Sequence, residues 1–185
     1  METRELKNGQ IMMIRKATKE DSSNIITYLN EVAGETNYLS FGQGEFAFSI
    51  AEEAEYIEES DKNPGSVMLL CCYVVMLLCF IDDELASISQ LIGHIKKREL
   101  HTSELAISIR KKYWGLGIGT ICMEELIKYA KSSEYLKLIY LEVVTENKRA
   151  INLYKKFGFI EAGEIPALMQ VDRRYLDVTM MYLVI

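Results

Sequence analysis

The chain has 185 residues, of which 49% are hydrophobic and 26% are charged, proportions that are ordinary for a globular protein large enough to bury a core. Its formal net charge of −6 opposes electrostatic binding to nucleic acid and mildly favours small cationic molecules. The two histidines and four cysteines lack the spacing of metal ligands, and the cysteines lie in apolar runs, so we expect free thiols and no metal site. Free thiols suit a reducing compartment, which indicates a cytoplasmic protein.

The N-terminal ten residues are polar, unlike the sequence that follows them. They contain neither a secretory signal pattern nor a glycine at position 2 for myristoylation. We expect residues 1–10 to form a flexible extension and residues 11–185 to form one domain, because no linker or shift in composition interrupts them.

Apolar periodicity predicts strands and helices in alternation along the rest of the chain. Strands are expected at 11–14, 67–81, 85–95, 103–109, 136–144, 159–166 and 175–185. Helices are expected between 18 and 34 and at 49–60, each opened by a capping signal, from 118 onward and at 148–157. A turn is expected at 63–65. The irregular segment 35–48 is rich in aromatic residues and could line a cleft. The continuous apolar run at 136–144 indicates a buried parallel strand, and the other strands favour an α+β fold with a mixed, mostly antiparallel sheet. The last strand is expected at an exposed sheet edge, which would allow a homodimer.

The sequence Val-Met-Leu-Leu-Cys occurs twice, at 67–71 and at 75–79. The apolar run that contains both copies is about fifteen residues long, which is shorter than a membrane-spanning helix. A central strand covered on both faces needs about six such residues, so one copy would be enough. The sequence suggests no function for the second copy.

Three glycines occupy alternate positions between a predicted strand and a predicted helix. Gly115, Gly117 and Gly119 remove side chains from this turn, so that backbone N–H groups can approach a ligand closely. Amides in front of a helix N-terminus form a site for phosphate oxygens. A glycine turn of this kind is also common for purely structural reasons, so the loop alone supports both interpretations.

Two familiar phosphate-binding loops fit this turn poorly. A P-loop requires Lys after its last glycine, whereas Thr120 follows here. A dinucleotide fingerprint requires the spacing G-x-G-x-x-G and a long βαβ series after it. The spacing here is G-x-G-x-G, although Glu142 lies where an acidic ribose ligand would be expected. The dinucleotide interpretation is therefore weakened but stays open.

Two segments together resemble the GNAT superfamily of N-acetyltransferases. The loop from Trp114 to Gly119 is similar to the acyl-CoA loop Arg/Gln-x-x-Gly-x-Gly/Ala, with Trp114 at the position of Arg or Gln. The segment from Asn147 to Phe159 matches Asn-x-x-Ala-x-x-Leu-Tyr-x-x-x-Gly-Phe at every specified position. The loop also resembles a bacterial branch with the sequence Tyr-Trp-Gly-x-Gly-Ile-Gly. The resemblance covers roughly residues 11–183 and implies an α/β/α-layered fold with about seven strands and four helices.

The resemblance implies an acetyltransferase that uses acetyl-CoA as co-substrate and a primary amine of a small molecule or peptide as acceptor. It implies that Tyr154 protonates the CoA sulfur and that Glu104 acts as general base, with direct attack of the amine on the thioester. Loop amides would hold the diphosphate, and the strand backbone together with Asn147 would hold the pantetheine arm. The implied cofactor-binding residues are Ile107, Ser108, Ile109, Trp114, Gly115, Leu116, Gly117, Ile118, Gly119, Thr120, Asn147, Asn152 and Tyr154.

Each of these side chains also has a structural interpretation. Asn147 suits the N-cap of the following helix, and Tyr154 shares a predicted apolar helix face with Ala150 and Ile151. Glu104 could be an exposed strand carboxylate. At the level of function, the alternative is a non-catalytic acyl-CoA-binding or regulatory module.

Overall fold

The computed structural model describes residues 1–62, 72–94 and 96–185. Eight strands form one sheet in the order β1-β2-β3-β4-β5-β6-β8-β7. The strands are β1 Glu2–Glu5, β2 Ile11–Lys16, β3 Cys72–Ile81, β4 Glu84–Gly93, β5 Thr102–Ile109, β6 Leu138–Val144, β7 Ile160–Val171 and β8 Arg174–Val184. The helices are α1 Ser22–Ala33, α2 Ile50–Lys62, α3 Ile118–Ser132 and α4 Lys148–Lys156. The pair β5–β6 is parallel and the other pairs are antiparallel, which confirms the α+β, mostly antiparallel prediction with eight strands in place of about seven.

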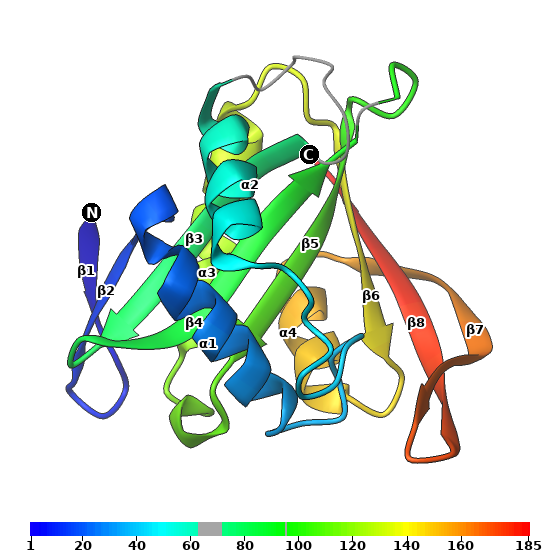
Figure 1. The fold of residues 1–185 in the computed structure, drawn as a ribbon. Helices are drawn as coiled ribbons and strands as arrows, with labels where there is room; N and C mark the ends of the chain where they lie inside the picture. The colour runs from blue at the N-terminus through cyan, green and yellow to red at the C-terminus, as the bar shows by residue number, and fades with distance from the viewer. Residues whose placement is uncertain (63–71, 95) are drawn as a thin grey trace.

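Helices cover both faces of the sheet and divide the core into two clusters (Figure 1). Apolar side chains of α3 and α4 pack on one face, where Leu105 of β5 is buried. Side chains of α1 and α2 pack on the other face, where Tyr28 of α1 donates a hydrogen bond to Oγ of Ser108 at 3.1 Å. Successive residues of β5 therefore point to opposite helical layers, as the period of two in a strand requires.

Capping boxes begin the first two helical segments, as the sequence predicted. The backbone N–H of Thr18 donates to Asp21 at 2.8 Å, and Arg15 makes two further hydrogen bonds to the same carboxylate. In the second box, the N–H of Ser49 donates to Glu52 at 2.8 Å and the N–H of Glu52 donates back to the Ser49 hydroxyl. These contacts satisfy N–H groups that the first turn of a helix leaves unpaired.

The N-terminal residues differ from the flexible extension that we expected. Glu2–Glu5 form β1, which pairs antiparallel with β2 at the edge of the sheet. Leu6 is 3% exposed and belongs to the α3-side core, and Arg4 donates to Glu125 of α3 at 2.7 Å. A short, polar strand lacks the apolar alternation by which strands are recognised, so its pairing could not be read from the sequence.

The C-terminal strand is also placed differently from the expectation. We expected residues 175–185 at a sheet edge, but β8 lies between β6 and β7, so that β7 is the edge. β7 also continues beyond Pro166 to Val171, with a register shift between Ile165 and Met169. An edge strand tolerates proline because one side of its backbone needs no ladder partner.

The central strand β3 contains the second copy of the apolar repeat. Val75, Leu77 and Cys79 pack toward α3, whereas Leu78 packs toward α1. This confirms a strand covered on both faces. The first copy, at 67–71, and the turn predicted at 63–65 lie outside the described residues. Among those described, no helix is long and apolar enough to cross a membrane.

Candidate active site

The parallel strands β5 and β6 separate after a short paired segment. Only residues 102–104 pair with residues 138–140. Farther along, β5 continues to pair with β4, and β6 pairs with β8. Among the described residues, the edge of β5 at 105–109 therefore has no sheet partner on the β6 side. An extended ligand can add to such an edge as another strand would.

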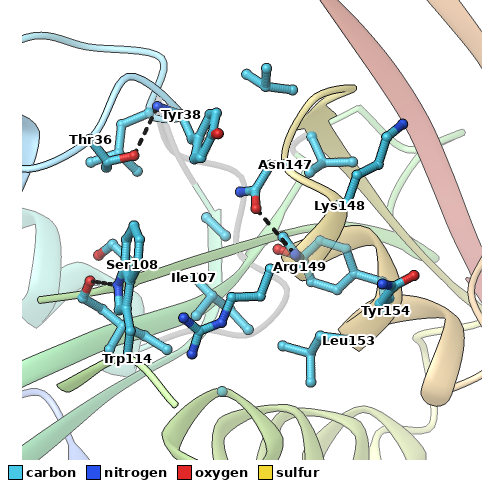
Figure 2. A pocket seen from close by; sticks show the side chains of 18 of the residues that line it. Thr36, Tyr38, Ile107, Ser108, Trp114, Asn147, Lys148, Arg149, Leu153 and Tyr154 are labelled. Carbon is cyan, nitrogen blue, oxygen red and sulfur yellow. Dashed lines mark hydrogen bonds between the residues drawn. The ribbon is translucent and has the colours of Figure 1, made fainter. Parts of the chain in front are cut away.

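A cavity of about 780 Å³ lies at this separation, a volume that suits a small-molecule ligand. It is lined by residues 104–109 of β5, the glycine loop, α4, and the segment between α1 and α2 (Figure 2). All of the site residues that the sequence suggested line this cavity except Leu116. The carbonyl of Leu116 accepts a hydrogen bond from the Lys7 N–H at 3.2 Å.

The glycine loop presents unpaired amides to the cavity. Gly115 and Gly117 have φ values of +90° and +99°, a region in which L side chains are strained. In the described part of the chain, the N–H groups of residues 115–119 donate to no acceptor. The Thr120 N–H is already used, because it donates to the Gly117 carbonyl at 3.0 Å. The remaining amides precede a 15-residue helix, whose N-terminal dipole favours an anion.

Gly119 has a second, structural reason to lack a side chain. A Cβ at this position would lie 3.0 Å from Cδ2 of Leu153 and 3.4 Å from Cδ1 of Ile109. The glycine therefore allows α3 to approach α4 and β5 closely. The structural interpretation of the loop is therefore confirmed at Gly119, whereas phosphate binding by the unpaired amides stays a prediction.

Trp114 fixes the loop to the end of β5. Its indole N–H donates to the carbonyl of Ile109 at 2.8 Å (Figure 2). The guanidinium of Arg149 lies over the indole ring, 5.4 Å from the centroid, at the distance of a cation–π contact. The position at which the family resemblance places Arg or Gln is therefore occupied by a side chain that positions the loop and holds a neighbouring cation.

Tyr154 extends from α4 toward the centre of the cavity (Figure 2). The residue is 7% exposed, and burial raises the pKa of its phenol to about 12. Its ring packs 5.8 Å from Phe159 and belongs to the α3-side core, so the packing interpretation is confirmed. Its hydroxyl makes no hydrogen bond with any described residue, which leaves the proton free for a ligand.

Asn147 begins α4, as its N-cap interpretation predicted. Its Oδ1 accepts a hydrogen bond from the Ala150 N–H at 3.2 Å. Within the described residues its side-chain NH₂ has no acceptor, so a donor remains on the cavity wall. Asn152 also lines the cavity from α4.

Glu104 of β5 lies beside a second carboxylate, that of Glu142 in β6, and the sequence did not predict this pair. Burial, together with the charge of Glu142, raises the pKa of Glu104 above its ordinary value, and His94 partly opposes this. Glu104 is opposite Tyr140 in the parallel pair, and Glu142 is two residues farther along β6 on the same face. The Tyr140 hydroxyl and Nε2 of His94 lie 3.0 Å apart. The period of two in a strand would have placed Tyr140 and Glu142 on one face of β6. That Glu104 lies beside them follows only from the register of β5 against β6.

The irregular segment between α1 and α2 forms the opposite wall, as its aromatic composition suggested. Thr36, Tyr38, Leu39 and Ser40 line the cavity, and Met169 of β7 contributes from the far end of the sheet. Two basic residues at the glycine loop, Lys7 and Arg149, line the cavity and are not among the site residues predicted from the sequence. Lys7 gave no signal, whereas Arg149 lies within the Asn147–Phe159 motif, at a position that the motif leaves unspecified.

Comparisons with known proteins agree with this geometry. The family model described as "Acetyltransferase (GNAT) family" matches residues 43–159. An N-alpha-acetyltransferase of Sulfurisphaera tokodaii is 32% identical over 87% of both chains. A spermidine N(1)-acetyltransferase of Vibrio cholerae is 30% identical over 56% of this chain and 60% of its own length. The crystal structure of a GNAT-family acetyltransferase from Streptococcus pneumoniae superimposes with a TM-score of 0.86, at 27% identity, over 94% of this chain and 99% of that one. The chain therefore belongs to the GNAT family and is an N-acetyltransferase.

Proposed function

We propose that the protein acetylates a primary amine on a cationic small molecule or peptide, and that the amine attacks the thioester directly. The observation that carries this proposal is the cavity at the β5–β6 separation, which both Tyr154 and Glu104 line. Acetyl-CoA supplies the activated acetyl group. The chain's own residues must then bind the coenzyme, remove a proton from the acceptor and return one to the departing sulfur.

The coenzyme-binding role rests on backbone groups. The unpaired amides at residues 115–119 suit the diphosphate, and the open edge of β5 suits the amide groups of a pantetheine arm. The free NH₂ of Asn147 can donate to a carbonyl of that arm. The side chain of Ser108 is held by Tyr28, so Ser108 contributes through its backbone.

Two side chains carry the proton transfers. Glu104 is the general base. Its pKa is raised toward neutral pH, and a catalytic base works best when its pKa lies near the working pH. Tyr154 is the general acid: burial raises the pKa of its phenol to about 12, so the hydroxyl is protonated at neutral pH and can donate a hydrogen bond to the departing sulfur. The low exposure of Tyr154 also keeps water from competing for that proton.

A pair of neighbouring carboxylates supports a cationic acceptor in one part of the cavity. Glu104 and Glu142 both line it, and the chain as a whole carries a net charge of −6. A relative that acts on spermidine, according to its name, and another that is named an N-alpha-acetyltransferase both have amine acceptors. In a substrate with two amino groups, the carboxylate of Glu142 would attract one as an ammonium ion while the other is deprotonated for attack.

The experiment combines a coenzyme-binding measurement with a thiol-release assay. Calorimetry should detect CoA binding, and acetyl-CoA should release CoA in the presence of at least one member of a panel of polyamines, aminoglycosides, amino acids and peptides. Mass spectrometry should find one acetyl group per released thiol. Binding without release for every amine would contradict the proposal and favour the non-catalytic acyl-CoA-binding module.

Assembly and location complete the proposal. The edge strand β7 exposes Ile160, Ile165 and Leu168, and a second copy could pair there to form a homodimer. Light scattering in solution tests this, and a monomeric mass would refute it. The free thiols of Cys79 and Cys122 support a reducing, cytoplasmic location.

A further inference from the structure

The glycine loop lacks the positive charge that a diphosphate group calls for. Its backbone amides can donate hydrogen bonds, but Trp114 is neutral and directs its own N–H to Ile109. Two basic side chains reach the loop from other parts of the chain. Lys7 arrives from the β1–β2 turn and Arg149 from the first turn of α4, and both line the cavity.

Lys7 is held against the loop by its own hairpin. Its backbone N–H donates to the Leu116 carbonyl at 3.2 Å, and the neighbouring Leu6 is buried in the core. The side chain runs past Gly117, because its Cγ and Cε lie 3.8 Å from the position that a Cβ on this glycine would take. The ammonium group forms no ion pair with a carboxylate among the residues that the structure describes.

Arg149 approaches the loop from the opposite helix. The Trp114 ring holds its guanidinium at 5.4 Å, and its Nη2 lies 3.9 Å from the position of a Cβ on Gly115. Within the described residues this guanidinium also lacks a carboxylate partner. The two unpaired cations thus lie near Gly115 and Gly117, whose amides are free.

We propose that Lys7 and Arg149 bind the diphosphate of CoA at the glycine loop and supply the positive charge that the loop itself lacks. The inference rests on the proposed assignment of the loop to the diphosphate. Hydrogen bonds from charged donors to phosphate oxygens are stronger than those from amides alone. The N-terminal hairpin thereby becomes part of the coenzyme site.

Calorimetry with three probes tests the proposal on the full-length protein. CoA, 3′-dephospho-CoA and pantetheine (titrated to millimolar concentration) share the thiol arm, but only the first two contain a diphosphate. Lys7→Met and Arg149→Met should each weaken binding of CoA and of 3′-dephospho-CoA on the order of ten-fold. Binding of pantetheine should stay the same, and Lys7→Arg should retain most of the affinity. Lys131→Met, at the exposed end of α3, is the matched control and should bind all three probes like the wild type.

Each contrary result has a distinct meaning. Equal loss for all three probes would show that the side chains support the fold of the loop and would overturn the proposal, as would no loss for any probe. A loss confined to CoA would assign the residues to the 3′-phosphate and likewise overturn it. The binding data do not depend on turnover, so a wild-type protein that binds CoA without acetylating any amine would refute the proposed function and leave this inference standing.

Discussion

In the proposed mechanism Tyr154 protonates the departing sulfur, because its buried phenol retains a proton that no described residue accepts. Tyr154→Phe removes this proton and preserves the ring that packs on Phe159. We expect turnover to fall on the order of ten-fold or more, because the sulfur must then leave as an unprotonated thiolate. The affinity for CoA should change little. The thiol-release assay measures the first quantity and calorimetry the second, and unchanged turnover would remove Tyr154 from the mechanism.

Glu104 should set the acidic limb of the pH profile of turnover. Its pKa is raised by burial and by Glu142, so activity should appear as the pH rises through this raised value. Glu142→Gln removes a neighbouring negative charge, which favours the ionised form of Glu104 and lowers its pKa. The acidic limb should therefore move to lower pH in this variant. Glu134→Gln, at an exposed residue outside the cavity, should leave the limb in place, and a limb unmoved by Glu142→Gln would exclude Glu104 as the titrating base.

At the scale of residues, the sequence could predict the groups that belong to contiguous motifs. The family resemblance assigns Trp114, Asn147 and Tyr154 to the site, and all three line the cavity. Lys7 could not be predicted, because its place at the loop depends on a hairpin that pairs far from the motif. Glu142 likewise gains its meaning from the register of β5 against β6, which one sequence does not reveal.

The conformation of the loop before α3 should depend on Gly117, which has a left-handed backbone conformation. Gly117→Val places a β-branched side chain at φ +99°, a conformation that strains any L residue, so the amides should lose their common direction. We expect the dissociation constant for CoA to rise on the order of ten-fold or more. Gly163→Val is the control, because that glycine lies in β7 with no atom near its Cβ position. Equal CoA affinity of the two variants, measured by calorimetry, would refute the loop assignment.

The start of α1 should depend on the carboxylate of Asp21. Burial opposes its ionisation, but hydrogen bonds from Arg15 and Thr18 outweigh burial and hold its pKa below the ordinary value. Asp21→Asn should lower the free energy of unfolding by about 1–2 kcal/mol at pH 7. An Asp whose pKa is lowered by folding stabilises the fold fully at pH values above its unfolded-state pKa of about 3.9. This stabilisation is lost as the pH falls through the lower pKa of the folded state.

In urea titrations, the difference in the free energy of unfolding between the wild type and Asp21→Asn should therefore become smaller toward pH 3. Asp83→Asn, in the exposed β3–β4 turn, should cost little at either pH because Asn also adopts its left-handed conformation. A deficit in Asp21→Asn that is independent of pH would show that packing, and not charge, stabilises this helix start.

At the scale of elements, prediction succeeded where apolar periodicity or capping residues define a segment. The bounds of α1, α2, α4, β4, β5 and β6 are predicted within a few residues, as is the start of α3. Polar β1 was missed, and β7 was ended too early at Pro166, because an edge strand needs neither an apolar face nor every N–H. The order of β7 and β8 in the sheet is a long-range property, and local patterns do not determine it.

At the scale of the whole molecule, the negative charge should influence acceptor binding. Added salt screens the attraction between a cationic acceptor and a chain of net charge −6. The KM for a polyamine should therefore rise several-fold between low and high ionic strength. Steady-state kinetics at two salt concentrations measures this change. A polyamine KM that is independent of salt would contradict the role given to the carboxylates of the cavity.

The separation of β5 from β6 links the fold to the chemistry, because it opens the cavity between the two helical layers of the molecule. A crystal structure of the complex with CoA tests this relation most directly. We expect the diphosphate on the amides of residues 115–119, the pantetheine arm along the free edge of β5, and the sulfur within hydrogen-bonding distance of the Tyr154 hydroxyl. A coenzyme bound elsewhere, or a sulfur out of reach of this hydroxyl, would contradict this expectation.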